Sequence, residues 1–436
     1  MDPTLFTTDA KLAPYWWDRV PRPALPAAEL PARADVVVVG SGYTGLHAAL
    51  QTARGGRATL VLDAEDAGFG CSTRNGGQVS TSVKPAFADL ARRHGEARAR
   101  EIVREGQRSL AWLGEFIAAE GIDCDYGVVG RFHAAHNPHQ FELLAHAATH
   151  QTPGLEVPAE VVPRAEQRRE LGTDAYWGGV LYTPHASVDP ARYHQGLLQR
   201  VLASGATVAA RCPATRIEKI GSGGGDVFAV HTPRGTVRTR DVVIASNGYT
   251  GTLTPWLRRR VIPIGSYIIA TEALPAALMD RLMPTQRIVS DTRRIVYYYR
   301  PSPDRTRILF GGRVSTDETD PAVSGPLLLA DLVALFPELA GTRISHSWCG
   351  FVAYTFDTVM HVGRHDGMHY AMGYCGSGVG MGSYLGMRLG QQVLGLPEGR
   401  TAFDDLPFPT RPLYTGKPWF LAASVRWYRW LDGRGR

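Results

Sequence analysis

The sequence has little lysine, little cysteine and no long apolar run. Of its 47 lysine and arginine residues, the lysines are Lys11, Lys84, Lys219 and Lys417, and the arginines are scattered along the chain rather than gathered into one basic segment. Scattered charge of this kind argues against a nucleic-acid-binding groove, in spite of a formal net charge of +6. We therefore expect no nucleic-acid partner.

The five cysteines are odd in number and include no C-x-x-C pair, which argues against a disulfide framework or a structural zinc site. The histidines of HAAHNPH, residues 133–139, have no cysteine or acidic residue among them and include a proline, so we interpret them as a loop without a metal. No run of about 18 apolar residues occurs, and the first residues lack a basic start followed by an apolar stretch. These absences predict a cytoplasmic protein with reduced thiols and no membrane-spanning helix.

A chain of 436 residues is longer than one hydrophobic core usually holds, so its length predicts two domains. The first clear unit begins with VVVV at 36–39, a β-branched run typical of a parallel strand that is covered on both faces. Leu46, Ala49 and Leu50 follow at helical spacing, and residues 59–62 supply the next strand. Together they predict a strand–helix–strand unit.

Between this first strand and the helix lies the motif G-x-G-x-x-G, formed by Gly40, Gly42 and Gly45. The first glycine allows a tight turn, the second lets a pyrophosphate approach the backbone, and the third allows close packing of helix on strand. Asp63 ends the second strand, where an acidic side chain can bind an adenosine ribose. The unit predicts a dinucleotide site but does not distinguish FAD from NAD, because both present the same ADP half. Its expected contacts are Gly40, Gly42, Tyr43, Thr44, Gly45, Asp63 and Ala64.

The stretch after this unit is glycine-rich and polar, and reads GFGCSTRNGGQ over residues 68–78. Here the sequence resembles the D-amino-acid oxidase-like (DAO) superfamily of FAD-dependent amine oxidoreductases, and within it the gamma-glutamylputrescine oxidoreductase group, whose pattern is G-x-G-A-S-G-R-N-G-G-Q. Cys71 and Thr73 stand where that pattern has Ala and Gly. The resemblance spans nearly the whole chain, through SYIIATEAL at 266–274, RILFGGR at 307–313 and GYCGSGVGMG at 373–382.

The resemblance implies FAD bound without a covalent link. Arg74 would then be a cation for the cofactor's diphosphate, and the turn at 376–380 would open a helix whose positive N-terminus faces the N1/C2 edge of the flavin. Cys349 lies near the position at which monomeric sarcosine oxidases attach flavin, but is shifted by one residue. The further implied contacts are Ser72, Thr73, Arg74, Asn75, Gly76, Gly77, Gln78, Ala214, Asn247, Gly248, Gly376, Ser377, Gly378, Val379 and Gly380.

The resemblance also implies a fold that combines the α/β and α+β classes, the glutathione-reductase-like DAO fold. A discontinuous Rossmann-like FAD-binding domain would carry an inserted, mostly antiparallel β substrate domain, which agrees with the alternating strands after residue 261. The C-terminal segment mixes tryptophans with arginines, and we expect a helix that packs on the FAD-binding domain, with a membrane surface as the alternative. The expected boundaries are 33–86, 155–260 and 342–410 for the FAD-binding domain, 87–154 and 261–341 for the substrate domain, 1–32 for an N-terminal arm and 411–436 for the C-terminal helix.

By the same resemblance, the chain should oxidise the C–N bond of an amine to an imine by hydride transfer to flavin N5, followed by hydrolysis to an aldehyde and an amine. O2 or another acceptor would reoxidise the flavin. Amino-acid oxidases of the superfamily commonly read W-x-G-x-R-P, with the arginine pairing to the substrate carboxylate. Val352 stands at the arginine's position, so we expect a gamma-glutamylputrescine-like or N-alkyl amine, secondary or conjugated, rather than a free amino acid. No catalytic acid or base is assigned, and the candidates for the substrate face are Tyr267, Tyr298, Arg300 and Trp348.

Two other functions stay open at this point. The first is an FAD-dependent monooxygenase or reductase served by NAD(P)H, which a second complete G-x-G-x-x-G would favour, and none follows Gly45. The second is a non-catalytic flavoprotein subunit, which a yellow protein that no amine bleaches would favour. The residues do not fix an oligomeric state.

Overall fold

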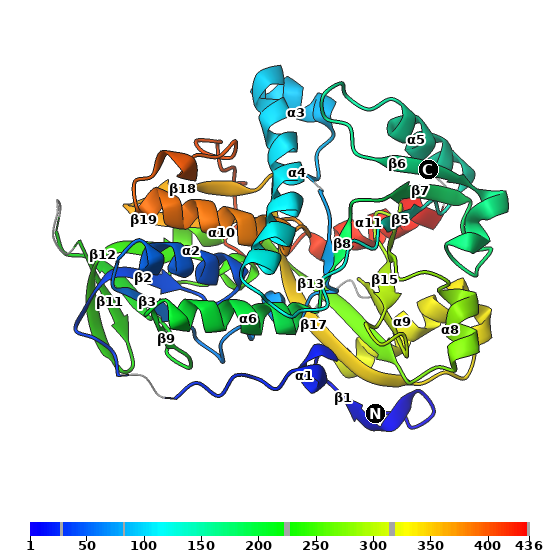
Figure 1. Ribbon diagram of the computed structural model, residues 1–436, viewed down its shortest axis with the longest axis horizontal. Helices are drawn as coiled ribbons and strands as arrows, with labels where there is room; N and C mark the ends of the chain where they lie inside the picture. Colours follow the sequence, from blue (N-terminus) through cyan, green and yellow to red (C-terminus); the bar gives the residue numbers. More distant parts are fainter. Residues whose placement is uncertain (27–28, 82, 222–226, 314–318, 434–436) are drawn as a thin grey trace.

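The computed structural model describes residues 1–26, 29–81, 83–221, 227–313 and 319–433, and two sheets organise them (Figure 1). One is an eight-stranded sheet with a parallel centre, here called the parallel sheet. The other is a nine-stranded, mostly antiparallel sheet. This architecture confirms the predicted fold class.

The parallel sheet is built around β2 (Arg33–Val39), which carries the four valines. Val36 and Val38 pack into one core and Val37 into another on the opposite face, and all three are fully buried. A run without polar alternation therefore became a strand covered on both sides, as the sequence predicted. The remaining strands of this sheet are β3 (Thr59–Leu62), β9 (Thr207–Ala209), β10 (Arg216–Lys219), β11 (Phe228–Thr232), β12 (Gly235–Ile244), β18 (His361–His365) and β19 (Met368–Met372).

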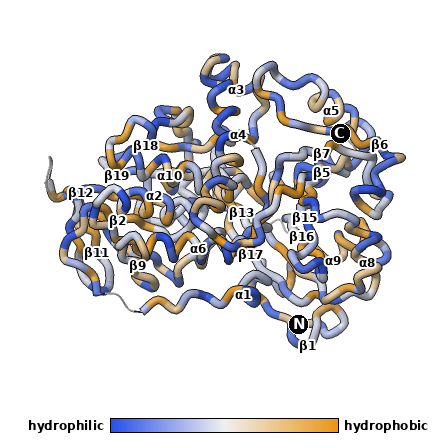
Figure 2. Tube along the Cα trace, viewed as in Figure 1, coloured by the Kyte–Doolittle hydropathy of each residue, from blue (hydrophilic) through white to orange (hydrophobic). Residues whose placement is uncertain are grey.

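Several helices share the core that covers one face of the parallel sheet. Among them are α2 (Tyr43–Arg54), α4 (Glu96–Ala119), α6 (Pro190–Ala203) and α10 (Gly380–Val393). In Figure 2 hydrophilic and hydrophobic residues alternate along α4, because one side of this helix faces the core through Ile102, Leu110 and Leu113 while the other side meets solvent.

The nine-stranded sheet is covered on one face by α8 (Ala276–Leu282) and α9 (Pro321–Leu335), which share a core with Tyr267, Tyr299 and Phe310. Its other face looks toward the parallel sheet. The strand order is β1 (Phe6–Lys11), β17 (Ile344–Thr355), β13 (Val261–Thr271), β16 (Ile308–Gly312), β15 (Tyr298–Pro301), β14 (Ile288–Asp291), β5 (Arg131–Ala134), β7 (Gly178–Tyr182) and β6 (Ala159–Pro163).

The sheets divide the chain differently from the expected boundaries. Strand β17 was expected in 342–410, and β6 and β7 in 155–260, yet all three belong to the nine-stranded sheet. The expected arm, 1–32, contributes β1 to that sheet, and α4, expected in the substrate domain, packs in the core beside α10. Strand pairing depends on hydrogen bonds between distant segments, which strand-forming patterns in the sequence do not specify.

The C-terminal helix forms as expected, as α11 (Leu421–Gly433), but it packs on the side of the nine-stranded sheet rather than on the parallel sheet (Figure 1). The Asp432 carboxylate accepts the backbone N–H groups of Arg294 and Ile295 at 3.0 and 3.1 Å. Trp427 and Trp430 stay exposed at 55% and 44%. Among the described residues, no helix has the length and apolar character needed to cross a bilayer.

Several shorter elements complete the described chain. They are α1 (Trp16–Arg19), β4 (Gln78–Val79), β8 (Ala186–Ser187), α3 (Phe87–His94), α5 (Pro138–Thr149), α7 (Pro255–Arg258) and the 3-10 turns Cys71–Thr73, Arg164–Arg169, Asn247–Tyr249, Pro337–Leu339 and Pro397–Gly399.

Candidate functional site

The glycine motif forms the turn between β2 and α2. Gly40 has a φ of +107°, which favours glycine. A Cβ at Gly45 would lie 1.9 Å from the carbonyl oxygen of Gly40, so glycine is required for α2 to begin this close to β2. Gly42 is the N-cap of α2, and no acidic residue lies in the first turn. The positive end of this helix therefore faces a cavity without a competing carboxylate on its own first turn.

Asp63, directly after β3, lines the same cavity beside the motif. Its Oδ2 accepts the backbone N–H and the hydroxyl of Ser41 at 2.8 and 2.5 Å, and its Oδ1 accepts the backbone N–H of Glu65 at 3.0 Å. These three bonds fix the carboxylate at the end of the parallel strands, where the sequence placed it.

The glycine-rich loop, residues 68–78, joins the two sheets. The Ser72 hydroxyl accepts the backbone N–H of Tyr43 at the start of α2, at 3.0 Å. Asn75 holds the loop on itself, since its side chain donates to the carbonyl of Cys71 and accepts the N–H of Gly77. At the far end, Gln78 Nε2 donates to one backbone carbonyl of β14 and one of β15, at 3.1 and 3.2 Å.

Arg74 braces this loop. Its Nε donates to the carbonyl of Phe69 at 2.7 Å and its Nη1 to the carbonyl of Cys349 at 3.2 Å. The guanidinium also lies over the rings of Phe69 and Trp17, at 4.3 and 4.6 Å. Burial lowers the pKa of Arg74. Arg74 is nevertheless one of the wall residues, while its guanidinium ties the loop to β17 and the N-terminal segment.

The start of α10 forms the third wall. Gly376, Ser377, Gly378 and Val379 line the cavity immediately before this helix. The Tyr374 hydroxyl and the Thr44 hydroxyl are 2.7 Å apart, which links this segment to the first turn of α2. Two helix N-termini therefore meet at one cavity.

The cavity measures about 1380 Å³ and runs from the glycine motif to the nine-stranded sheet. Single-ligand pockets usually measure roughly 300–1,000 Å³, so this one has room for a dinucleotide and a second molecule. The expected contacts on its wall are Gly40, Gly42, Tyr43, Thr44, Asp63, Ala64, Ser72, Arg74, Asn75, Gly76, Gln78, Ala214, Asn247, Gly376, Ser377, Gly378 and Val379. The expected contacts outside the described wall are Gly45, Thr73, Gly77, Gly248 and Gly380.

Three of these five residues have clear places beside the wall. Gly248 packs against the backbone of β17, where a Cβ would lie 2.6 Å from the carbonyl oxygen of Phe351. Thr73 is buried and its hydroxyl donates to the carbonyl of Gly68 at 2.7 Å. Gly380 is the first residue of α10.

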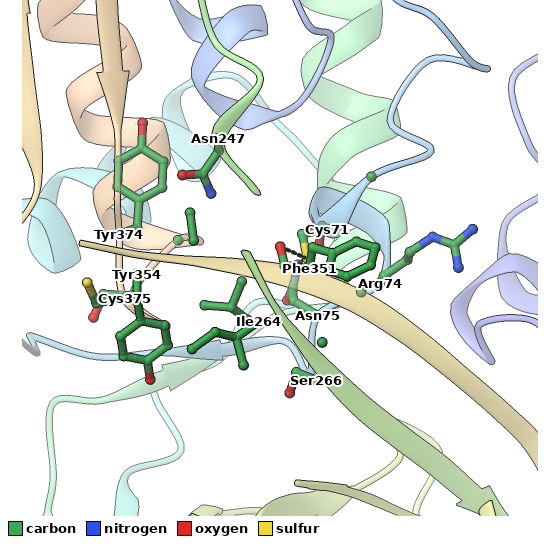
Figure 3. A pocket seen from close by; sticks show the side chains of 18 of the residues that line it. Cys71, Arg74, Asn75, Asn247, Ile264, Ser266, Phe351, Tyr354, Tyr374 and Cys375 are labelled. Atoms are coloured by element: carbon green, nitrogen blue, oxygen red, sulfur yellow. Dashed lines mark hydrogen bonds between the residues drawn. The ribbon is translucent and has the colours of Figure 1, made fainter. Parts of the chain in front are cut away.

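Strands β13 and β17 both contribute to the cavity wall. Ile264 and Ser266 of β13 and Val352 and Tyr354 of β17 line it, and in Figure 3 Ile264 lies between Tyr354 and Asn75 of the glycine-rich loop. Val352 is paired with Ile264 across the two strands. The position at which an arginine was expected in amino-acid oxidases therefore faces the cavity with an apolar side chain.

Of the four candidates for the substrate face, Tyr298 lines the cavity, and its hydroxyl lies 2.7 Å from the Ser266 hydroxyl. The other three do not. Tyr267 is fully buried on the opposite face. Trp348 and the buried Arg300 lie on the same strand face as Val352 and Tyr298, but each donates to the backbone of the glycine-rich loop, which covers them: Trp348 to the carbonyl of Arg74, and Arg300 to the carbonyl of Gly77. Tyr267 alone of the three points to the opposite face, and the sequence did not reveal which face was the functional one.

Cys349 and Cys71 differ in whether they line the cavity. Cys349 packs against the core of Tyr267, away from the cavity. Cys71 lines the cavity, donates its thiol to the carbonyl of Phe351 at 2.9 Å, and has its pKa raised to about 12 by burial. A thiol with so high a pKa stays protonated at neutral pH, and so it is a poor nucleophile.

Wall residues outside the expected contacts include Lys84 before α3, Arg131 and His133 of β5, Phe420 directly before α11 and Tyr428 of α11. His133, which was expected in a loop, lies on a strand. The alternation of Arg131 and His133 in RFHA was the available signal, because it places two basic residues on one face of a strand. Within the described chain, no group of histidine, cysteine and acidic residues could hold a metal.

A family model described as "FAD dependent oxidoreductase" (DAO) matches residues 35–392 of the chain. Gamma-glutamylputrescine oxidoreductase of Escherichia coli (strain K12) is 31% identical over 333 residues, which are 76% of each chain. A protein of Rhizobium meliloti named "Probable oxidoreductase OrdL" is 30% identical over 338 residues, 77% of this chain and 76% of that one.

Solved structures share the fold. Glycine oxidase from Geobacillus kaustophilus superposes with a TM-score of 0.73 at 20% identity, over 88% of this chain and 99% of that one. L-proline dehydrogenase from P. horikoshii superposes with a TM-score of 0.69 at 16% identity, over 91% of this chain and 99% of that one.

Proposed function

The chain belongs to the DAO family of FAD-dependent oxidoreductases, which act on CH–NH or CH–NH2 donors, and on that premise we propose that it oxidises the C–N bond of a secondary or conjugated amine. The product is an imine, which water hydrolyses to an aldehyde and an amine. The observation that carries this proposal is a single cavity that joins the glycine motif to an apolar sheet face bearing Val352.

The residues present fit FAD. A Cβ at Gly42 would lie 2.9 Å from the Ser72 hydroxyl, so glycine lets the glycine-rich loop approach the start of α2, and the backbone of this turn lines the cavity where a diphosphate would bind. Asp63 is positioned for the ribose, Arg74 supplies a cation on the wall, and the segment 376–379 supplies a second helix N-terminus. When bound, FAD supplies the hydride acceptor. Cys349 supports a non-covalent mode, because it is half-buried against the core of Tyr267 and does not line the cavity.

The sheet face prepares the amine for oxidation. Ile264 and Val352 offer an apolar surface, which disfavours an ammonium ion and so lowers the pKa of a bound amine toward the neutral form that oxidation requires. Burial raises the pKa of Tyr298, so this hydroxyl stays protonated and can donate a hydrogen bond. With Ser266 it forms a pair of hydroxyls that can orient the amine. No side chain needs to act as a strong base.

Val352 decides between classes of amine. A free α-amino acid needs a cation for its carboxylate close to the reacting carbon, as a bidentate arginine provides. A valine at this position leaves such a carboxylate against an apolar surface, which is costly. The site is therefore better suited to an amine that carries no carboxylate on the reacting carbon, as in gamma-glutamylputrescine.

The test is anaerobic mixing of the yellow holoenzyme with gamma-glutamylputrescine, sarcosine, D-amino acids and aminophosphonates. We expect the conjugated or secondary amines to bleach the flavin absorbance. Bleaching by free D-amino acids alone would contradict the argument from Val352. Bleaching by NAD(P)H and by no amine would indicate a reductase or monooxygenase, and bleaching by none of them would indicate a non-catalytic subunit.

A matched variant tests the cofactor site itself. Gly42→Asp places a carboxylate where the diphosphate would lie, so the purified variant should lack flavin absorbance. Folding is checked by circular dichroism against the wild-type apoprotein. A folded Gly42→Asp variant with normal flavin content would contradict the assignment of the glycine motif.

A further inference from the structure

The cavity face of the nine-stranded sheet changes character from one end to the other. At β13 and β17 it is apolar, with Ile264 and Val352. Toward the other end, Tyr298, Ser290 and His133 stand in register on β15, β14 and β5, and all three line the cavity. Arg131 lies two residues before His133, hence on the same face, and also lines the cavity.

This far end is positively charged. Arg293 forms an ion pair with Asp291, and these two charges offset each other. Arg131 and Arg294 add further cations, and Asp291 is the acidic residue among the described wall residues of this part; the other acidic residues, Asp63 and Glu65, lie at the glycine motif. A wall with this balance attracts an anion into the end of the cavity that lies away from Val352.

Arg131 is held in place by uncharged groups. Its Nη2 lies 3.4 Å from His133 Nδ1, and its guanidinium carbon lies 5.3 Å from the centre of the Tyr182 ring. Burial, together with the charge of Arg131, lowers the pKa of His133 to about 3, so His133 is neutral at physiological pH and the positive charge resides on the arginine. Lys84 Nζ lies 5.6 Å from the centre of the Tyr354 ring on β17, so this cation belongs to the other part of the wall.

We propose that Arg131 forms a subsite for a carboxylate at the far end of the substrate. The inference rests on the proposed function and names its substrate class, an amine with a distal carboxylate. Strands β15 and β5 are two spacings apart, roughly 10 Å at about 4.8 Å per strand. The carboxylate is therefore separated from the amine near Tyr298 by a chain of several bonds, whereas the two groups of an α-amino acid share one carbon. Arg131, which binds the carboxylate, is on β5, whereas β17 presents the apolar Val352 to the reacting end of the substrate.

The test compares two amines that differ in one charge: N-(4-aminobutyl)glutaramic acid, with a free carboxylate, and its carboxamide. Wild-type holoenzyme should have a lower KM for the acid. In Arg131→Gln this KM should rise about 10- to 100-fold, the loss expected for a hydrogen bond between charged groups, while KM for the carboxamide stays within about twofold. Arg131→Lys should retain part of the preference.

Arg164→Gln is the matched control. Arg164 also lies over an aromatic ring, that of Trp177 at 3.8 Å, and it is outside the described cavity wall. This variant should leave both KM values unchanged. Equal KM values for acid and carboxamide in the wild-type enzyme would overturn the proposal, and this comparison holds even if Arg131→Gln does not fold.

A binding measurement separates this proposal from the proposed function. Glutarate, which has no oxidisable amine, should perturb the flavin absorbance of the wild-type holoenzyme and bind more weakly to Arg131→Gln by calorimetry. If no amine bleaches the flavin but glutarate binds through Arg131, the subsite stands and the amine oxidation is wrong. If amines are oxidised but glutarate binds equally to the wild type and Arg131→Gln, the subsite is wrong and the oxidation stands.

Discussion

Helices α2 and α10 touch through a row of glycines, and one substitution there should weaken both the fold and the cofactor site. Gly382, Gly386 and Gly390 follow one another at intervals of four residues along α10. A Cβ at Gly386 would lie 2.5 Å from the carbonyl oxygen of Thr44 and 2.7 Å from its Cα. Both are backbone atoms of α2, so no side-chain rotation can relieve the contact, and Gly386→Ala must push the helices apart.

The size of the effect follows from two opposing contributions. Overpacking of a close contact typically costs about 1–3 kcal/mol, and replacing glycine by alanine within a helix returns about 1 kcal/mol. Because the clash is with backbone atoms, we take the upper part of the first range, about 2–3 kcal/mol. The net loss is then roughly 1–2 kcal/mol, which lowers the melting temperature by about 1–2 °C in a chain of this length. Because Thr44 lies in the first turn of α2, the displaced helix should also bind FAD about 10-fold more weakly.

The assay is thermal melting of the holoenzyme together with FAD titration of the apoprotein. Gly382→Ala is the matched control on the same face of α10, one turn earlier. Its Cβ would lie 3.3 Å from the Thr44 side-chain oxygen, so the neighbour needs to move by only a few tenths of an ångström and FAD affinity should change little. If Gly386→Ala matches the wild type in both melting and FAD affinity, the reasoning from the backbone contact is refuted.

Two further predictions concern a buried acid and the substrate wall. Burial raises the pKa of Glu105 on α4 to about 7 from 4.5, so its charged form is disfavoured in the folded state, and stability should fall as pH rises from 4.5 through 7. Glu105→Gln should have the same free energy of unfolding as the wild type near pH 4 and be more stable than the wild type by roughly 3 kcal/mol near pH 8. Thermal melting at the two pH values checks this, and equal melting midpoints of variant and wild type at both would contradict it. Tyr298→Phe removes the hydroxyl beside Ser266, so kcat/KM should drop about 10-fold at unchanged flavin content, and an unchanged kcat/KM would exclude an orienting role.

The parts of the site that could be predicted are those carried by short, contiguous segments. The turn through Gly40, Gly42 and Gly45, the acid Asp63 and the loop 68–78 all lie where their spacing placed them, and most of their residues line one cavity. Each is a local structural feature: a turn conformation, a helix start or a strand end. Such features are determined by neighbouring residues, which is why one sequence suffices to find them.

The substrate side was harder to predict because it depends on which face of each strand points inward. Tyr267 and Ser266 are neighbours in the sequence, yet Tyr267 is buried in one core and Ser266 lines the cavity. Both faces of β13 carry apolar and aromatic residues, so alternation alone did not mark the functional face. Arg131 was missed for a related reason: its strand, β5, is far from β13 in sequence, and the sequence did not show that the two strands belong to one sheet.

By itself the sequence determined the strand–helix–strand unit and its dinucleotide-binding turn, because a glycine motif, a covered parallel strand and a helix start are set by residues close together in the chain. FAD and the fold class followed from the resemblance to the DAO superfamily. Only the tertiary structure decided that β1, β5, β6, β7 and β17 share one sheet, that α11 walls the cavity, and that Val352 and Arg131 lie at different places on one face. Strand pairing and facing are decided by hydrogen bonds and packing between distant segments, and the site for the substrate is built from those contacts.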